Sequence, residues 1–178
     1  MTEGMYHYIQ KAWKQPNYSD LRKRMVEWRR GNAVVKVDKP LRLDRARNLG
    51  YKAKPGFTVV RVKLMRGGRE RTRPRSGRKG KNLTIRKNLM MNYREVAEQR
   101  ANSKYPNLEV LNSYWIGKDG VYTFYEVIMI DPTHPQIIND ANLNWIVRNK
   151  GRVYRGKTSA GIKARGLRYK GKRKTKFF

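Results

Sequence analysis

The chain has 178 residues, and its 43 lysines and arginines against 13 acidic residues give a formal net charge of +30. A chain with this charge repels itself, which favours a polyanionic partner, either nucleic acid or an anionic membrane surface. The absence of cysteine excludes disulfides and most structural zinc sites, and no apolar run approaches the roughly 18 residues that span a bilayer.

The first thirty residues predict two short amphipathic helices separated by Pro16, the second with Ser19 as its N-cap and ending at Gly31. A short strand is predicted over residues 33–37. Leu43 begins a third short helix, which a following glycine would end. This part of the chain therefore predicts helices and one strand that must pair with strands later in the sequence.

Residues 57–65 predict a strand, because β-branched residues dominate the segment. Residues 66–82 hold almost no apolar side chain, so they predict an extended basic loop. A helix with an asparagine N-cap is predicted over residues 92–103. Within it, Glu95 and Glu98 lie beside arginines and are expected to form surface ion pairs.

Residues 108–116 and 121–130 are apolar, aromatic-rich runs joined by Gly-Lys-Asp-Gly, a pattern that predicts a β-hairpin. We expect this hairpin to form the centre of the core. One or two helical turns are predicted over residues 139–147. The aromatic residues expected in the core of the hairpin are Trp115, Tyr122, Phe124 and Tyr125.

These elements predict an α+β fold, a small and mainly antiparallel sheet with packed helices. Residues 1–147 are predicted to form a single domain that contains the basic loop, and residues 148–178 a basic C-terminal tail. The tail carries thirteen lysines and arginines and no acidic residue, while the segment 61–87 carries twelve against Glu70. Because the two runs contain a single acid between them and no apolar face to solubilise, both predict binding to a polyanion rather than a solvated surface.

One motif suggests a different chemistry. Gly151–Thr158 fits G-x-x-x-x-G-K-[ST], the phosphate-binding loop of many nucleotidases, and Asp131 ends an apolar run that could hold magnesium. However, a working loop needs a buried strand before it and a packed helix after it. The residues that follow are glycine-rich and carry no apolar helical stripe, so a chance match in a basic segment is the better interpretation.

No other set of residues suggests catalysis or metal binding. The two histidines, His7 and His134, lie in different segments without a nearby acidic cluster, so neither a catalytic set nor a metal site is predicted. A DNA-compacting chromosomal protein stays an alternative, because it would also be basic and cysteine-free. A peptide of the membrane surface is a weaker alternative, because the basic runs lack the apolar face that it requires.

Five stretches together resemble a known family: YHYIQKAWK at 6–14, LDRARNLGYKAKPGF at 43–57, LEVLNSYWIGKDG at 108–120, FYEVIMIDPTHPQI at 124–137 and RGKTSAGIKARGL at 155–167. They are similar to the archaeal and eukaryotic (e) type of protein fifteen of the large ribosomal subunit. The match runs in order along nearly the whole chain, and R-G-x-T-x-A-G is the tail motif of that family. The sequence departs from the family in reading VAEQR where VAEER is more common, and in the details of the loop.

The resemblance implies a small α+β domain embedded in large-subunit rRNA, with neighbouring ribosomal proteins as further partners. It implies a structural role in cytoplasmic ribosomes, with no catalysis, membrane or small-molecule substrate. No cofactor is expected beyond Mg²⁺ associated with the rRNA, and an archaeal source is expected. Most contacts should be to phosphates and 2′-hydroxyls.

The residues expected to bind rRNA are the basic side chains of the third helix, the loop and the tail, together with one tyrosine that could stack on a base. They are Arg42, Arg45, Arg47, Tyr51, Lys52, Lys54, Arg66, Arg69, Arg71, Arg73, Arg75, Arg78, Lys79, Lys81, Arg152, Arg155, Lys157, Lys163, Arg165 and Arg168.

Overall fold

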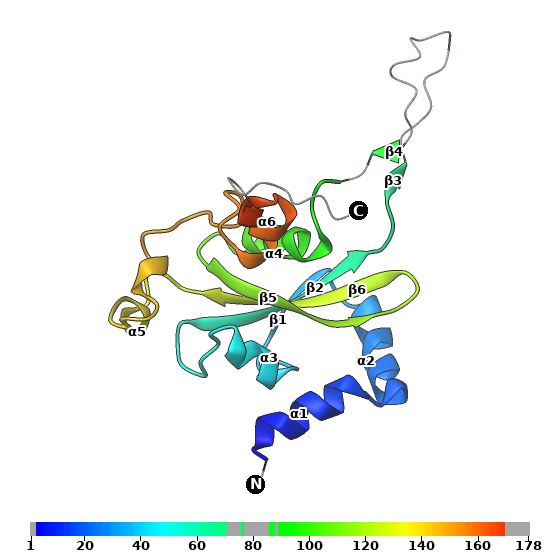
Figure 1. Cartoon of the computed structure of the whole chain (residues 1–178), viewed down its shortest axis with the longest axis horizontal. Helices are drawn as coiled ribbons and strands as arrows, with labels where there is room; N and C mark the ends of the chain where they lie inside the picture. The colour runs from blue at the N-terminus through cyan, green and yellow to red at the C-terminus, as the bar shows by residue number, and fades with distance from the viewer. Residues whose placement is uncertain (1–2, 71–75, 77–85, 88, 170–178) are drawn as a thin grey trace.

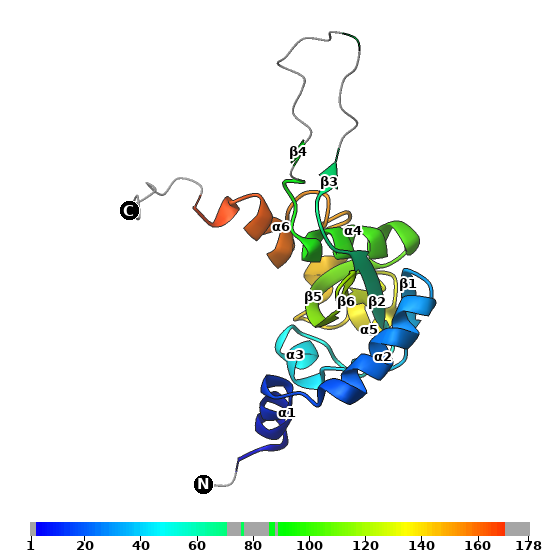
Figure 2. The ribbon, with the colours of Figure 1, turned by 90° about the vertical axis from the view of Figure 1, so that its right-hand side faces the viewer.

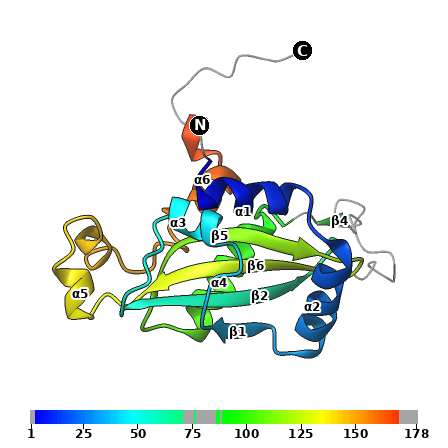
Figure 3. The ribbon, with the colours of Figure 1, turned by 90° about the horizontal axis from the view of Figure 1, so that it is seen from below.

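Four antiparallel strands in the order β1-β2-β6-β5 form the central sheet of the computed structural model, which describes residues 3–70, 76, 86–87 and 89–169 (Figure 3). The predicted α+β class and the antiparallel sheet are confirmed. Strand β5 forms one edge of the sheet, and β1 forms the other. The strands are β1 (Val34–Val37), β2 (Phe57–Met65), β5 (Glu109–Lys118) and β6 (Tyr122–Ile130).

Helices cover both faces of the sheet (Figures 1 and 2). Helices α1 to α3 lie on one side, and α4 and α6 lie on the other, while α5 sits beyond one end of the strands. None of the helices in the described part of the chain is long and apolar enough to cross a membrane. The helices are α1 (Met5–Lys14), α2 (Tyr18–Arg30), α3 (Leu43–Asn48), α4 (Tyr93–Lys104), α5 (Pro135–Ile138) and α6 (Ser159–Ala164), with 3₁₀ turns at Asn144–Ile146 and Leu167–Tyr169.

The core lies on both faces of the sheet. Beneath α4, Val62 and Val127 pack with Ala97 and Ala101, and on the opposite face Trp28 of α2 packs edge to face against Phe124. The prediction that Phe124 lies in the core is confirmed, since the residue is fully buried. Small alanines on α4 let its backbone approach the sheet closely, which explains how a helix of low overall hydrophobicity packs there.

Local details of the prediction differ at three places. Asn17, not Ser19, caps α2, because its side chain accepts the backbone N–H of Ser19 two residues on. Helix α5 was not predicted, and a proline in its first turn opens it. Residues on either side of the basic loop are paired: β3 (Arg69–Glu70), which lies within the predicted loop 66–82, forms a short antiparallel ladder with β4 (Arg86–Lys87), which follows it.

The predicted surface position of Glu98 is wrong, because the residue is fully buried, but the predicted ion pair is present, with Arg94 Nε 4.0 Å from the carboxylate. Its carboxylate accepts hydrogen bonds from Ser113 Oγ on β5 and from Thr158 Oγ1 just before α6. Burial raises the pKa of Glu98, while these hydrogen bonds and the charges of Arg94 and Arg152 oppose the rise. The carboxylate thus joins three elements that are distant in sequence.

Glu95 is buried as well, with 3% of its surface exposed, so it also lacks the predicted surface position. Its backbone N–H donates to the Asn92 side chain at 2.8 Å, which confirms Asn92 as the N-cap of α4. Asparagine at this position satisfies one of the unpaired N–H groups of the first helical turn.

The first part of the predicted tail lies in the core. Val153 is fully buried in the apolar cluster beneath α4, and Thr158 caps α6 by accepting the N–H of Gly161. A Cβ built at Gly161 would lie 2.9 Å from the Cα of Gly156, so the two backbones approach more closely than any other residue allows. Residues 148–164 are therefore held against the domain rather than extended from it.

The close contact between the two glycines predicts a stability effect. Gly161→Ala places the new methyl group against backbone atoms that cannot move aside, an overpacking that costs about 1–3 kcal/mol. The better helix propensity of alanine offsets up to about 1 kcal/mol. We expect a net loss in the free energy of unfolding, measured by urea titration. Gly120→Ala is the control, because nothing lies within 4 Å of its built Cβ, and an equal effect of the two changes would contradict the packing argument.

The buried carboxylate predicts a pH dependence. Because the pKa of Glu98 is raised in the folded state, the folded chain keeps this proton at pH values where the unfolded chain, with a pKa of about 4.3, has lost it. The stabilisation is full below the unfolded pKa and is lost as pH rises through the folded pKa. We expect the stability of the native chain relative to Glu98→Gln to increase as pH falls, measured by urea unfolding at several pH values. A difference that is constant with pH would contradict it.

Candidate nucleic-acid interface

Helix α3 presents the first group of predicted cations. The guanidinium of Arg42 lies 4.8 Å from the ring centroid of Trp13, and that of Arg47 lies 5.8 Å from the ring of Tyr6. These cation–π contacts attach α1 to α3, since α1 has no buried residue. Arg45 is exposed between them. The predicted arginines of this helix therefore both position α1 and carry charge at the surface.

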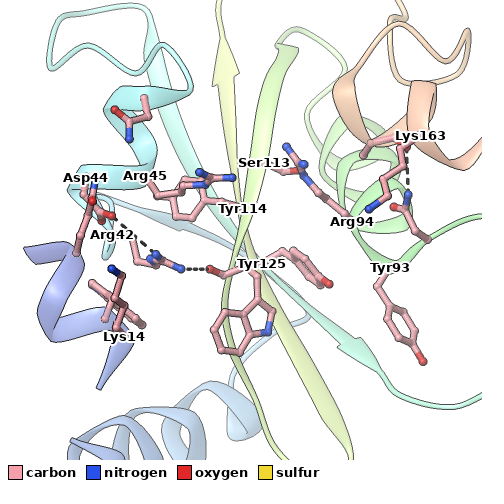
Figure 4. Close-up of a pocket in the computed structure, with 16 residues that line it drawn as sticks. Lys14, Arg42, Asp44, Arg45, Tyr93, Arg94, Ser113, Tyr114, Tyr125 and Lys163 are labelled. Carbon is pink, nitrogen blue, oxygen red and sulfur yellow. Dashed lines mark hydrogen bonds and ion pairs between the residues drawn. The ribbon is translucent and has the colours of Figure 1, made fainter. Parts of the chain in front are cut away.

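Arg42 and Arg45 belong to a groove that runs over the edge strand β5, with a volume of about 700 Å³. Helices α1 and α3 form one bank, and the N-terminus of α4 together with α6 forms the other. Figure 4 shows Arg42 and Arg45 on one bank and Arg94 and Lys163 on the other, with Tyr114 and Tyr125 between them. We call this depression the β5 groove. Its basic residues are Lys14, Arg42, Arg45, Arg94 and Lys163.

Positive charge in the β5 groove is only partly compensated. Asp44 is the one carboxylate in its lining, and it is buried and lies 3.8 Å from a guanidinium nitrogen of Arg42. Within the described residues, Lys14, Arg45 and Lys163 form no ion pair and are exposed. An anion entering the groove would therefore meet side chains whose charge is available to it.

Arg94 is fixed in the wall of the groove. Its Nε donates to Ser113 Oγ at 2.9 Å, and its guanidinium also donates to the side chain of Asn112. Burial lowers the pKa of Arg94; Glu98 opposes this, and the positive charges of Arg45 and Arg168 lower the pKa further. The repulsion from Arg45 crosses the groove, so a bound anion would relieve it.

Aromatic rings line the floor. Trp115 and Tyr125 are cross-strand neighbours on β5 and β6, and Tyr93 begins α4. The prediction that Trp115 lies in the core is wrong, because 39% of its surface is exposed. Tyr125 is half-buried. Exposed rings beside cations are the combination that binds unpaired bases and phosphates together.

Other predicted residues are occupied by contacts within the protein. Tyr51 packs edge to face on Phe57, with ring centroids 5.7 Å apart, so the expectation that it faces little core is wrong. Lys52 and Lys54 both donate to Asp140 Oδ2, at 2.8 and 2.7 Å, and these bonds lower the pKa of Asp140. These lysines thus hold the segment before β2 against the segment that follows α5.

Arg152 has an internal role. Only 8% of its surface is exposed, its guanidinium lies 4.5 Å from the ring centroid of Trp145, and it donates to the carbonyl groups of Val110, Leu111 and Lys157. Burial lowers its pKa, and the charges of Glu109 and Glu98 oppose this. The residue therefore attaches the tail to the edge strand rather than presenting charge at the surface.

The remaining predicted residues are placed as follows. Arg155 and Lys157 are exposed and contact nearby groups of their own segment, while Arg165 and Arg168 are exposed after α6. Arg66 donates to the carbonyl of Asp119, and Arg69 lies in β3. Six predicted cations lie outside the described residues: Arg71, Arg73, Arg75, Arg78, Lys79 and Lys81.

The motif resembling a nucleotide loop is explained by packing. The hydroxyl of Thr158, which would be a magnesium ligand in such a loop, is fully buried and bonded to Glu98. Gly161 is needed for its close approach to Gly156, as described above, and Gly156 has a positive φ of 66° that favours glycine. In the part of the chain that the structure describes, no three histidine or acidic side chains are grouped so that they could hold a metal ion.

Sequence reasoning missed Lys14, Tyr93, Arg94 and Trp115 as members of the groove. Local patterns indicate a solvated helix face for Lys14, an ion pair for Arg94 and a strand core for Trp115, and they assign no role to Tyr93. They come together only because α1, α4 and β5 meet in the folded chain. Of the predicted residues, the groove gathers Arg42, Arg45 and Lys163.

An α+β domain with cations gathered around an aromatic-lined groove, and with two cation-rich runs in its sequence, has the features of a nucleic-acid-binding protein of the accessory type found in ribonucleoproteins. Comparisons with known proteins identify it further. A family model described as "Ribosomal L15" matches residues 4–178. "Large ribosomal subunit protein eL15" of Methanospirillum hungatei JF-1 is 51% identical over 179 aligned residues, which cover 97% of this chain and 91% of that protein.

The chain therefore belongs to the Ribosomal L15 family and is a structural constituent of the large ribosomal subunit. The resemblance drawn from the five sequence stretches is confirmed. The expected archaeal source stays a prediction, as does Mg²⁺ associated with the rRNA.

The β5 groove predicts a specific salt dependence. Changing Lys14, Arg45 and Lys163 together to glutamine should weaken rRNA binding. With fewer phosphate contacts, fewer counterions are released from the RNA when the protein binds. The slope of log K against log salt should become less negative by about 0.7–0.9 per contact, or about 2 in total. The measurement is a salt titration of binding to large-subunit rRNA fragments.

The control variant removes three exposed cations outside the groove, Arg22 and Arg24 on α2 and Lys36 on β1 at the opposite edge of the sheet. Its net charge is the same as that of the groove variant. Equal slopes for the two variants would contradict a role for the groove.

Proposed function

We propose that this protein stabilises the folded large-subunit rRNA by screening phosphates of RNA segments that must approach one another, and that it does so without catalysis. The binding surfaces in this proposal are the β5 groove, the basic loop and the basic residues after α6. The observation that carries the proposal is the gathering of five basic side chains from four elements, with a single carboxylate among them, around one groove. Such convergence is not needed for folding, since repulsion between the cations opposes it.

The non-enzymatic role is supported by the chemistry of the buried polar residues. Glu98 accepts hydrogen bonds from the hydroxyls of Thr158 and Ser113, and all three residues are fully buried. Glu126, another buried carboxylate, accepts hydrogen bonds from the Tyr114 hydroxyl and from the backbone N–H of Leu41. These contacts join elements of the fold, which is a structural use of the groups.

Binding to rRNA is expected to read shape and backbone more than base sequence. Arginine and lysine side chains on surfaces of fixed spacing contact phosphates and so position the protein, and they carry little sequence information. The spacing between α3, α6 and the base of the loop is set by the sheet to which all of them attach (Figure 2). Neighbouring ribosomal proteins are further partners in the assembled subunit.

The basic loop can be tested separately from the fold. Glu70 and Arg86 are directly opposite each other in the β3–β4 ladder, so residues 71–85 can be replaced by Asn-Gly, a favoured two-residue hairpin turn. The variant should unfold at the same urea concentration as the native chain, but it should co-migrate poorly with large subunits on a sucrose gradient. Binding to rRNA fragments should also show a shallower salt dependence, because six cations are removed.

A control loop keeps its length and replaces the six basic residues between Glu70 and Arg86 by glutamine. If charge is what matters, this control should behave like the shortened loop. Normal incorporation of both variants would contradict the proposal for the loop. Equal affinity for rRNA and for duplex DNA in competition binding would favour the chromosomal alternative.

A further inference from the structure

We infer that the β5 groove seats an unpaired nucleotide of a single RNA strand, with its base stacked on Trp115 and the flanking phosphates held between the two basic banks. The inference rests on the proposed binding to rRNA and specifies the kind of RNA that this groove takes. The inference gives Trp115 the role of stacking on a base, which the cations of the loop and tail do not perform.

The first argument is the exposure of the indole ring. Trp115 is 39% exposed, whereas its neighbours Tyr114 and Ile116 are 3% and 0% exposed. Strand β5 is irregular on both sides of this segment, between Val110 and Asn112 and between Trp115 and Gly117. Such irregularities redirect side chains at sheet edges and beside binding sites. A large apolar ring left open among cations is what a stacking contact requires.

The second argument is the arrangement of charge around the ring. Arg42 donates to the backbone carbonyl of Trp115 at 3.4 Å, and Arg94 is held by Ser113, two residues before Trp115 along β5. Arg45 and Lys163 face the same groove from opposite banks (Figure 4). Phosphates on either side of a stacked base could therefore contact a cation on each bank without moving the backbone.

A duplex fits these features poorly. Bases of an RNA helix are stacked on one another and cannot reach a ring on the floor of a groove, whereas unpaired bases can be splayed onto aromatic side chains. A volume of about 700 Å³ is in the range of sites that enclose small ligands. The groove therefore suits one or two nucleotides rather than a double helix.

A protein strand is the other class of partner that an open sheet edge can bind. Here, however, the edge of β5 is partly occupied. Arg152 donates hydrogen bonds to the carbonyl groups of Val110 and Leu111, and Arg42 donates one to the carbonyl group of Trp115. The two irregularities also break the regular spacing of backbone groups that strand addition needs. Both observations favour RNA over an added strand.

The test is a double-mutant cycle between the ring and the base. The full-length protein and Trp115→Leu are titrated with oligouridylate and with an abasic ribose-phosphate oligomer of the same length. We expect Trp115→Leu to weaken binding to oligouridylate about tenfold or more and to leave binding to the abasic oligomer unchanged. Trp115→Phe, which keeps a smaller ring, should give an intermediate loss.

Trp145→Leu is the matched control, because Trp145 is 40% exposed and lies outside the groove. Urea unfolding of each variant verifies that it is folded. Equal losses on both oligomers, or no loss on oligouridylate, would overturn the inference. If those outcomes are found and the native protein still binds rRNA fragments with a strong salt dependence, only the stacking role of Trp115 is contradicted. If the native protein does not bind rRNA fragments in this way, the proposed function is contradicted as well.

Discussion

The buried carboxylate of Glu98 is the contact on which the arrangement of the binding surface depends. Glu98 belongs to α4 and accepts hydrogen bonds from Ser113 of β5 and from Thr158, the N-cap of α6. It therefore joins three elements that are distant from one another in the sequence. A buried charge is costly unless it is bonded and compensated. Here two hydroxyls and the nearby charges of Arg94 and Arg152 supply the compensation. Together with Arg152 on the carbonyls of β5 and the buried Val153, this contact holds α6 across the edge strand from α3.

Contacts between cations and other groups of the protein also explain how so basic a chain can fold. Several cations are used in contacts within the protein: Arg152 binds backbone carbonyls, and Arg42 and Arg47 lie over aromatic rings. Others, such as Lys52 and Lys54, share one carboxylate. Of the remaining cations, Lys14, Arg45 and Lys163 gather at the groove, and the sequence concentrates many others in the basic runs 61–87 and 148–178. Repulsion there is tolerated because the partner is a polyanion that removes it on binding.

Much of the fold could be predicted from local sequence. The strand over residues 57–65 and the following hairpin were predicted because β-branched content and a turn signal act over short distances, and Asn92 was found as a cap for the same reason. The burial of Glu98 could not be predicted, since its partners lie 15 and 60 residues away. Trp115 was misplaced because alternation along a strand does not reveal a bulge. The groove combines such long-range effects, so only its individual cations could be named beforehand.

The ladder between β3 and β4 has a topological consequence. It brings the two ends of the basic loop to the same place, with Glu70 opposite Arg86, so the intervening segment leaves and re-enters the body at one point. A segment closed in this way has no free end that could be passed through a hole already formed in folded RNA. It can enter a gap in folded RNA only with both of its ends side by side, so the gap must be wide enough for two chains. The two residue pairs of the ladder thereby set the smallest opening in the RNA that suits the loop.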